Sequence, residues 1–342
     1  MKPPTQSIVI ADVESHLPEC DGDARKSDLD SLSGNSSSTV GRTRLISAKW
    51  LADLSLISVA LMWGINIPIM KYALGLIDPF CFNAFRLSIS AVVLGLCAWW
   101  ETRRRGEPRG RKAYFRIACY ALLSGFVYQY LFVVGIFRTT GGNTALIMSS
   151  MPMWTAVLAF FLIRERLSLV AWLGLLITLV GTVIVTLQKE DLNSSASLLW
   201  GNLIVLAAAL AWAVATVMSR PVLQSISPIA LAFIANAATL PLHIAVATPH
   251  LREGILALKD PVVIGCLVYS GVFSTGISYA MWHYGVRQVG ASHAATYQNL
   301  IPIVALTGGW LFLQESLLLG QIVGGSLIIS GLIFMRRGRS RS

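Results

Sequence analysis

Ten long apolar segments dominate this chain and leave few architectures open to it. From Trp50 onward, each segment is long enough to cross about 30 Å of hydrocarbon as a helix, and short polar stretches separate the neighbours. The spans of a β-barrel would be shorter and would alternate in polarity, which these do not. The sequence therefore predicts an all-α polytopic membrane protein with ten transmembrane helices, at residues 50–75, 79–100, 114–137, 142–162, 167–187, 198–219, 228–248, 261–283, 291–313 and 317–335.

The composition excludes a water-soluble class. With 55% apolar and only 13% charged residues, the chain has too little polar surface to coat a soluble globule of 342 residues. Its net charge of +10 would favour nucleic-acid binding in a soluble domain, but the basic residues fall in short clusters beside apolar segments. We therefore expect the lipid bilayer as the surroundings and no nucleic acid as a partner.

The second half of the chain repeats the first about 150 residues later. Residues matched by this offset keep their type, as in the pairs Trp63 and Trp212, Pro152 and Pro302, Glu165 and Glu315, Gly174 and Gly324, and Gly181 and Gly331. The positive charges are not kept: at the positions that correspond to Arg164 and Arg166, the second copy has Gln314 and Ser316. Loss of positive charge from one short loop of a matching repeat is typical of two copies that lie upside down relative to each other.

Charge counting gives the expected orientation. Most Lys and Arg residues fall in the segments that are cytosolic if the amino terminus is cytosolic, and this excess predicts that both termini are cytosolic. Five helices per copy is an odd number, which inverts the second copy. The sequence thus predicts two inverted five-helix repeats, at 49–189 and 197–336, followed by a basic cytosolic tail at 337–342.

Residues 1–48 differ from the rest. They are rich in Ser, Asp, Glu and Gly and carry no long apolar run, which is typical of a disordered tail. They lack the basic start and apolar stretch of a secretory signal, and their acidic residues argue against an organellar transit peptide. We expect a disordered cytosolic tail on a multi-pass protein of the cell membrane, the inner membrane in a bacterium.

Several motifs together resemble the EamA-type domain of the drug/metabolite transporter superfamily. In the first copy they are Met62-Trp63-Gly64-Ile65-Asn66 with Lys71, Arg86, Pro152, Arg164-Glu165-Arg166-Leu167, Gly174 and Gly181; in the second, Gly290-Ala291-Ser292, Pro302, Glu315 and Gly324. The resemblance covers about residues 50–335. It implies ten helices in two inverted halves, transport of small metabolites, and a cavity lined by the first, third, fourth, sixth, eighth and ninth helices.

Polar and aromatic residues in the middles of those helices are the candidates for substrate binding, because carriers of this kind bind their substrate near the bilayer midplane between the halves. They are Asn66, Tyr128, Gln129, Ser149, Trp154, Trp212, Tyr279, Trp282, Tyr297, Gln298 and Asn299. Each has an alternative role. Gln298 and Asn299 can instead hold helices together, the aromatic residues can simply pack, and Asn66 can bond carbonyls freed by a kink at Pro68.

Two basic residues lie within predicted spans. Lys71, near the outer end of the first helix, can reach the membrane surface, whereas Arg86 lies deeper and needs a carbonyl, a helix end or the substrate as its partner. The resemblance favours an architectural role for Arg86. No acidic residue lies in the middle of a span, so facilitated diffusion or exchange is expected ahead of proton coupling, unless His283 or His293 couples. Both histidines are expected at hydrated helix ends.

Prolines and glycines carry further expectations. Pro68, Pro152 and Pro302 interrupt otherwise helical spans and are candidate hinges. The glycines allow close helix approach, and the resemblance implies a contact between two copies of the chain through the fifth and tenth helices, hence a possible homodimer.

We expect a secondary transporter, an exporter ahead of an importer, that moves small metabolites such as amino acids or related compounds across the cytoplasmic membrane by alternating access. The alternative is an importer or exchanger of a vitamin or a nucleobase-like solute; a different class is a membrane receptor, scaffold or channel. Motifs for intramembrane catalysis are absent from the sequence, so we expect no enzyme, no metal and no cofactor.

Overall fold

The structure is a computed structural model, and it describes residues 50–102, 111–163, 168–187, 195–314 and 318–339. Several features considered above lie outside these ranges. They are the tail at 1–48, most of the basic loop after the second helix, Glu165 with its two flanking arginines, Glu315, Ser316 and residues 340–342.

The described residues before 188 form one run of helices. A first helix spans Trp50–Ala73. It is followed by α2 (Pro79–Thr102), by a long helix made of α3 (Arg111–Tyr120), the π-helical segment η1 (Ala121–Val127) and α4 (Tyr128–Arg138), and then by α5 (Gly141–Met148), α6 (Met151–Ile163) and α7 (Leu169–Leu187).

The residues from 195 onward repeat this order of elements. They form α8 (Ser195–Val222), α9 (Pro228–Ala247), the short η2 (Thr248–His250) and α10 (Leu251–Ala257). A second long helix follows, made of α11 (Pro261–Val268), the π-helical segment η3 (Tyr269–Ile277) and α12 (Ser278–Val289). The chain ends with α13 (Ala291–Tyr297), α14 (Leu300–Leu313) and α15 (Leu319–Arg339). Helix α10 falls in what the sequence predicted to be a loop.

Seven described helices are long and apolar enough to cross a membrane. They cover the predicted spans at 50–75, 79–100, 114–137, 167–187, 198–219, 228–248 and 261–283. The predicted spans at 142–162 and 291–313 are each broken in two, and the apolar part of α15 is shorter, at Leu319–Met335. All-helical architecture with several membrane-spanning segments is thus what the structure shows, and the count of ten spans stays a prediction.

Five helices begin at a side-chain cap whose residue type explains the start. The cap oxygen accepts a hydrogen bond from a backbone N–H of the first turn, and in three of the five cases proline follows the cap and occupies the first helical position, where no N–H is needed. The caps are Asp78 before Pro79, Thr140 before Gly141, Ser168 before Leu169, Ser227 before Pro228 and Asp260 before Pro261.

The two broken helices break at matching places. One turn separates α5 from α6 at Ser149 and Ser150, and another separates α13 from α14 at Gln298 and Asn299, 149 residues later. The serine hydroxyls donate to the carbonyls of Leu146 and Ile147, at 2.6 and 2.7 Å, which holds the first turn closed. Pro152 and Pro302 lie in the first turn of the helix after each break, where proline is tolerated. The first helix is unbroken around Pro68.

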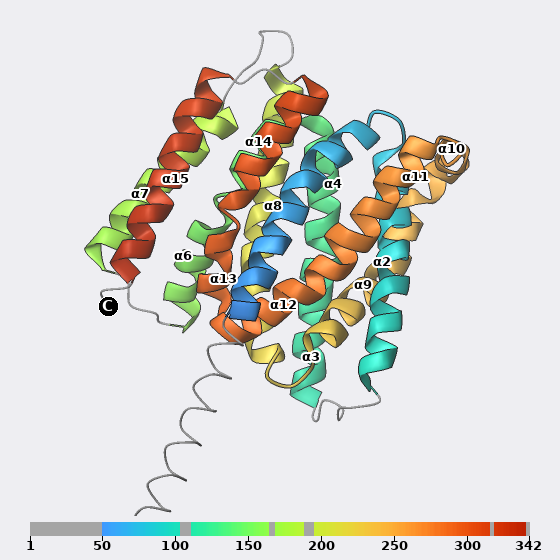
Figure 1. The fold of residues 1–342 in the computed structure, drawn as a ribbon, viewed down its shortest axis with the longest axis horizontal. Helices are drawn as coiled ribbons and strands as arrows, with labels where there is room; N and C mark the ends of the chain where they lie inside the picture. The colour runs from blue at the N-terminus through green and yellow to red at the C-terminus, as the bar shows by residue number, and fades with distance from the viewer. Residues whose placement is uncertain (1–49, 103–110, 164–167, 188–194, 315–317, 340–342) are drawn as a thin grey trace, which may run out of the picture. The chain divides into compact units, whose positions relative to one another are not determined.

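Helix pairs that correspond in the two halves pack against each other. Helix α2 packs on α9, and α7 packs on α15 along most of its length. Figure 1 shows α7 and α15 side by side at one edge. Glycines allow this contact, because a Cβ added to Gly181 would lie 2.6 Å from the carbonyl oxygen of Gly324, and one on Gly331 would lie 2.6 Å from that of Gly174. The expected close approach at these glycines therefore occurs within one chain.

Large apolar side chains cover much of the outside of the described residues. Trp100, Leu169 and Phe312 are each more than 70% exposed. Exposed apolar area of this extent is costly in water and ordinary in lipid. The interior contains small residues and aromatic side chains, and among them lies a cavity.

Candidate functional site

A cavity of about 40 Å³ lies in the interior, where the first helix meets α2, α4, α8, η3 and α12. Its volume suffices for roughly three water molecules. The lining residues are Trp63, Asn66, Ile67, Arg86, Tyr128, Gln129, Phe132, Met148, Met151, Trp212, Ser274, Thr275, Tyr279 and Ile301. Six residues singled out from the sequence are brought together here: Asn66, Arg86, Tyr128, Gln129, Trp212 and Tyr279.

Aromatic rings form one wall of the cavity. Trp63 and Trp212 meet edge to face with their ring centroids 5.4 Å apart, and Trp212 lies 4.7 Å from Tyr128. Tyr279 contacts both tryptophans, at 5.9 and 5.4 Å. The indole N–H of Trp63 donates to the carbonyl of Ser274 at 2.9 Å, which fixes this ring against η3. Such rings offer flat apolar surface to a bound solute.

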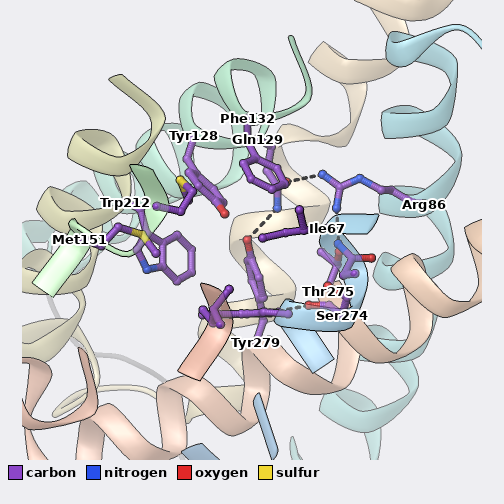
Figure 2. A pocket seen from close by; sticks show the side chains of 14 residues that line it. Ile67, Arg86, Tyr128, Gln129, Phe132, Met151, Trp212, Ser274, Thr275 and Tyr279 are labelled. Carbon is purple, nitrogen blue, oxygen red and sulfur yellow. Dashed lines mark hydrogen bonds between the residues drawn. The ribbon is translucent and has the colours of Figure 1, made fainter. Parts of the chain in front are cut away.

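Among the described residues that line the cavity, Arg86 is the only one with a charged side chain. It reaches inward from α2 (Figure 2), is 2% exposed, and donates three hydrogen bonds to neutral oxygens. The acceptors are Asn83 Oδ1 at 3.0 Å, Thr275 Oγ1 at 2.9 Å and Gln129 Oε1 at 2.6 Å. These three residues belong to α2, η3 and α4, so the guanidinium joins elements of both halves. Arg86 thus bonds elements of both halves and also lines the cavity, and the architectural role expected for it stays a prediction.

The hydrogen bonds around Arg86 continue on both sides. The amide of Gln129 donates to Tyr279 Oη at 2.8 Å, which spans the cavity wall (Figure 2). On the other side, Asn83 Nδ2 lies 3.0 Å from His243 Nδ1, and His243 Nε2 lies 2.8 Å from the carbonyl oxygen of Gly125. A carbonyl can only accept, so Nε2 carries the proton and Nδ1 accepts from Asn83.

His283 differs from its expected setting. It is fully buried, not at a hydrated helix end, because α12 turns it toward α3. Its Nδ1 bonds the carbonyl oxygen of Tyr279, and its Nε2 bonds the hydroxyl of Tyr120. His293, by contrast, is exposed and lies against the ring of Tyr297.

Four further predicted residues do not line the cavity. Ser149 bonds its own helix, and the indole N–H of Trp154 donates to Ser150 Oγ at 3.1 Å. Trp282 is buried behind Trp63, with ring centroids 5.4 Å apart. Tyr297 donates to Asp53 Oδ1 at 2.7 Å, at the end of the first helix that begins with Trp50.

Gln298 and Asn299 form the turn between α13 and α14 and are also absent from the lining. Gln298 is 2% exposed. Its Nε2 and Asn299 Oδ1 have no hydrogen-bond partner among the described residues. Both roles open from the sequence, substrate contact and contact between helices, stay predictions.

Lys71 is held at the opposite end of the first helix. Its ammonium donates to the carbonyl oxygens of Ile136, Phe137 and Thr139, at 3.2, 3.3 and 2.6 Å. Two of these are among the last carbonyls of α4, which lack partners within the helix, so a cation there is favourable. Lys71 therefore caps α4 instead of only reaching toward the membrane surface.

Some lining residues were missed from the sequence as site candidates, chiefly Trp63 and Thr275, together with Asn83 and His243 behind Arg86. Trp63 had a signal, because it is the repeat counterpart of Trp212. The others are ordinary polar residues of membrane helices, and only the packing of α9 and η3 on α2 brings them to Arg86.

Two buried polar atoms of the lining residues have no partner among the described residues. They are Asn66 Oδ1, an acceptor, and Trp212 Nε1, a donor. Buried polar groups are rarely left without partners. Among the described residues, no group of three or more His, Cys, Asp or Glu side chains could hold a metal ion.

Comparison with known protein families matches residues 50–187 and again residues 199–337 to the EamA-like transporter family. The chain belongs to this family. The EamA-like segments account for both halves of the cavity, since Trp63, Arg86 and Gln129 come from the first and Trp212 and Tyr279 from the second. The protein is therefore a multi-pass membrane protein of a transporter family.

Relatives of the EamA-like chain extend over most of its length. A protein of Bacillus subtilis (strain 168) named as the uncharacterized transporter YoaV is 31% identical over 286 residues, which are 82% of this chain and 95% of that protein. An uncharacterized transporter of Archaeoglobus fulgidus is 25% identical over 301 residues, 85% of this chain and 99% of that protein. A solved crystal structure has a similar fold, with a TM-score of 0.54 at 17% identity, and covers 84% of this chain and 95% of that chain.

Proposed function

We propose that this protein is a secondary transporter that moves a small metabolite across the cell membrane by alternating access, with the solute bound in the cavity at Trp63, Arg86 and Trp212. One observation carries the proposal: the cavity is lined by side chains from both EamA-like segments, at the middle of long apolar helices. Movement of one half against the other would then expose the same groups to either side in turn.

The inverted arrangement of the halves is part of this proposal and is supported by the contact of α7 with α15. Gly174 meets Gly331, and Gly181 meets Gly324. Since Gly331 is the repeat counterpart of Gly181, and Gly324 that of Gly174, each glycine contacts the counterpart of the other. The helices therefore run antiparallel, as a twofold axis lying in the membrane plane would require. Ten spans follow if the two broken helices and α15 each cross the membrane.

The contact of Trp63 with Trp212 gives independent support. These residues are repeat counterparts, 149 positions apart, and their rings meet at 5.4 Å on the cavity wall. Counterparts can touch only close to the axis that relates the halves. The cavity then lies on that axis, which is where a site exposed alternately to both sides is needed.

Two contacts at opposite ends of the first helix close the cavity. Asp53 bonds Tyr297 at one end, and Lys71 binds the end of α4 at the other. The 18 residues between them span about 27 Å of helix. With both contacts made, the cavity is too small for a metabolite, so we assign this arrangement to an occluded state. By the positive-inside bias the Asp53 end is cytosolic, as are both termini.

Flux measurements on purified protein in proteoliposomes test the proposal. We expect saturable, exchange-stimulated uptake of at least one metabolite from a panel of amino acids, organic acids and nucleobases. Trp212→Ala should lower that flux at least tenfold, because it removes a ring that contacts Trp63, Tyr128 and Tyr279. Trp100→Ala is the matched control, since that side chain is 79% exposed.

Two results would contradict the transporter proposal. Flux that rises linearly with solute concentration, together with single-channel currents, would indicate a channel. Equal loss of flux and of folded protein in Trp212→Ala, with Trp100→Ala unaffected, would indicate that the aromatic wall only packs. Uptake compared between right-side-out and inverted vesicles decides between export, which we favour, and import.

A further inference from the structure

The charge balance of the cavity narrows the chemistry of its ligand. Every Asp and Glu among the described residues lies at or near the end of a helix: Asp53, Asp78, Glu101, Glu253 and Asp260. The three hydrogen-bond partners of Arg86 are an amide oxygen, a hydroxyl and a second amide oxygen, all neutral. A buried guanidinium held only by neutral groups keeps a whole positive charge next to the cavity, and such a charge is costly unless an anion pairs with it.

The donors of Arg86 are only partly used. A guanidinium has five N–H groups, and among the described residues Asn83, Thr275 and Gln129 each accept from one of them. The single N–H of Nε is taken by Asn83. One N–H then remains on each terminal nitrogen, Nη1 and Nη2. A carboxylate that pairs with a guanidinium in bidentate fashion accepts two N–H groups, which is the number that remains here.

The aromatic wall alone would suggest a different ligand. Rings such as Trp63, Trp212 and Tyr279 attract cations to their faces and commonly bind ammonium groups. Arg86 lines the same small cavity, and its charge repels a cation in surroundings of low dielectric constant. The rings are therefore left to pack against the apolar part of a ligand whose charge is negative.

We propose that the cavity selects a monoanionic carboxylate with an apolar or aromatic body: the carboxylate pairs with Arg86, and the body packs against the aromatic wall formed by Trp63, Trp212 and Tyr279. The proposal deepens the transport function above. It rests on that function only for the claim that the bound carboxylate is carried across the membrane, since binding itself can be measured separately. The arriving carboxylate uses the two N–H groups of Arg86 that remain, so Gln129 keeps its hydrogen bonds to Arg86 and Tyr279.

Binding to purified full-length protein in detergent tests the proposal. Within each set of probes the apolar group is the same, and only the charged or polar group differs. The sets are phenylacetate, phenylacetamide and phenethylamine, and hexanoate, hexanamide and hexylamine, each measured by calorimetry. We expect at least one acid to bind, its amide to bind at least about tenfold more weakly, and its amine not to bind. Phenyl phosphate is included to separate a carboxylate from other oxyanions.

Two substitutions make the test specific for Arg86. Arg86→Gln should weaken binding of the acid to the level of the amide. Gln129→Glu keeps the size of the side chain and supplies a built-in carboxylate, so it should weaken binding of the acid at least tenfold while the folded protein is retained. Ser88→Ala, whose hydroxyl bonds only the backbone of α2, is the control and should bind like the unmodified protein.

Several results would overturn the proposal. They are equal or tighter binding of the amide or the amine, tighter binding of phenyl phosphate than of the acids, failure of both acids to bind, and unchanged acid binding in Gln129→Glu. Should Arg86→Gln fail to fold, Gln129→Glu and the probe sets still decide. Acid binding without saturable flux would contradict the proposed transport function but not the carboxylate proposal. Saturable flux restricted to neutral or cationic solutes would contradict the carboxylate proposal but not the transport function.

Discussion

Asn83 shows how a single neutral side chain can hold a buried charge in place. Its Oδ1 accepts from Arg86 Nε, and its Nδ2 donates to His243, which in turn donates to the backbone of Gly125 in η1. The guanidinium is thereby fixed with its terminal nitrogens toward Gln129 and Thr275. Neutral groups with fixed dipoles can orient a charge without cancelling it, which leaves that charge available to a ligand.

Replacing Asn83 by Ala should therefore destabilise the fold. The change leaves a buried charged donor without its acceptor and His243 without its donor, and such losses cost about 1–3 kcal/mol. Chemical unfolding in detergent micelles measures the effect. Ser88→Ala on the same helix removes only a hydroxyl bonded to its own backbone and should cost less than about 0.5 kcal/mol. If the two variants were equally stable, the orienting role of Asn83 would be refuted.

At the scale of elements, the contact of α7 with α15 depends on glycines, which have no side chain to separate the two backbones. The two helices approach so closely that backbone atoms of one occupy the space where a Cβ of the other would be. Dispersion contacts between backbones are the main attraction available to helices in lipid. Because these glycines contact each other within the chain, a homodimer would need other surfaces, and it stays a prediction.

Gly331→Val should disrupt this helix pair. Its Cβ would lie 2.6 Å from the carbonyl oxygen of Gly174 and 2.6 Å from the backbone nitrogen of Thr178, neither of which can move alone. Overpacking of this kind costs about 1–3 kcal/mol or more. The matched control is Gly265→Val in α11, where nothing lies within 4 Å of the added Cβ. Size-exclusion profiles and thermal unfolding compare the two, and equal behaviour would contradict the described packing.

The helices also show which structural features hydropathy can predict and which it cannot. Apolar length located the helices within a few residues, because a membrane helix must bury its backbone in one continuous apolar run. The breaks at Ser149 and Gln298 were not predicted, since they lie inside such runs, and only Pro152 and Pro302 marked their neighbourhood. The π-helical segments were not predicted either, because a shift from i−4 to i−5 hydrogen bonds leaves the apolar composition unchanged.

At the scale of the whole molecule, alternating access requires that the two ends of the cavity open separately. In the proposed mechanism Asp53 and Tyr297 close one end, and their Oδ1 and Oη atoms lie 2.7 Å apart. In protein freed of its five native cysteines, Asp53→Cys combined with Tyr297→Cys should allow a short thiol cross-linker to lock that end. We expect flux in proteoliposomes to stop on cross-linking and to return when a cleavable linker is cut.

The single substitutions, treated with the same linker, control for modification of one thiol. Continued flux in the cross-linked double variant would show that the Asp53 end does not open during transport. Cross-linking that lowers flux no more than modification of either single cysteine would likewise contradict a gate at this position.

The site itself was half predictable from sequence. The repeat and the mid-helix polar residues pointed to Asn66, Tyr128, Gln129, Trp212 and Tyr279, and all five line the cavity together with Arg86. Tyr297, Gln298 and Asn299 were the densest polar group in the sequence and yet do not line it, although Ile301, two residues further on, does. Sequence spacing locates a residue along a helix, but packing decides which face meets the cavity.

The π-helical segments have a further consequence for how the chain can change over time. A π turn contains one more residue than the α-helical path around it, so the helix faces before and after η1 are rotated by about 100° relative to an unbroken helix. Tyr120 meets His283 before this segment, and Gln129 meets Arg86 after it. Deleting or inserting one residue in η1 would leave a continuous apolar helix, but it would rotate either Tyr120 away from His283 or Gln129 away from Arg86. The number of residues between Tyr120 and Gln129 is therefore as constrained as the identity of these two residues.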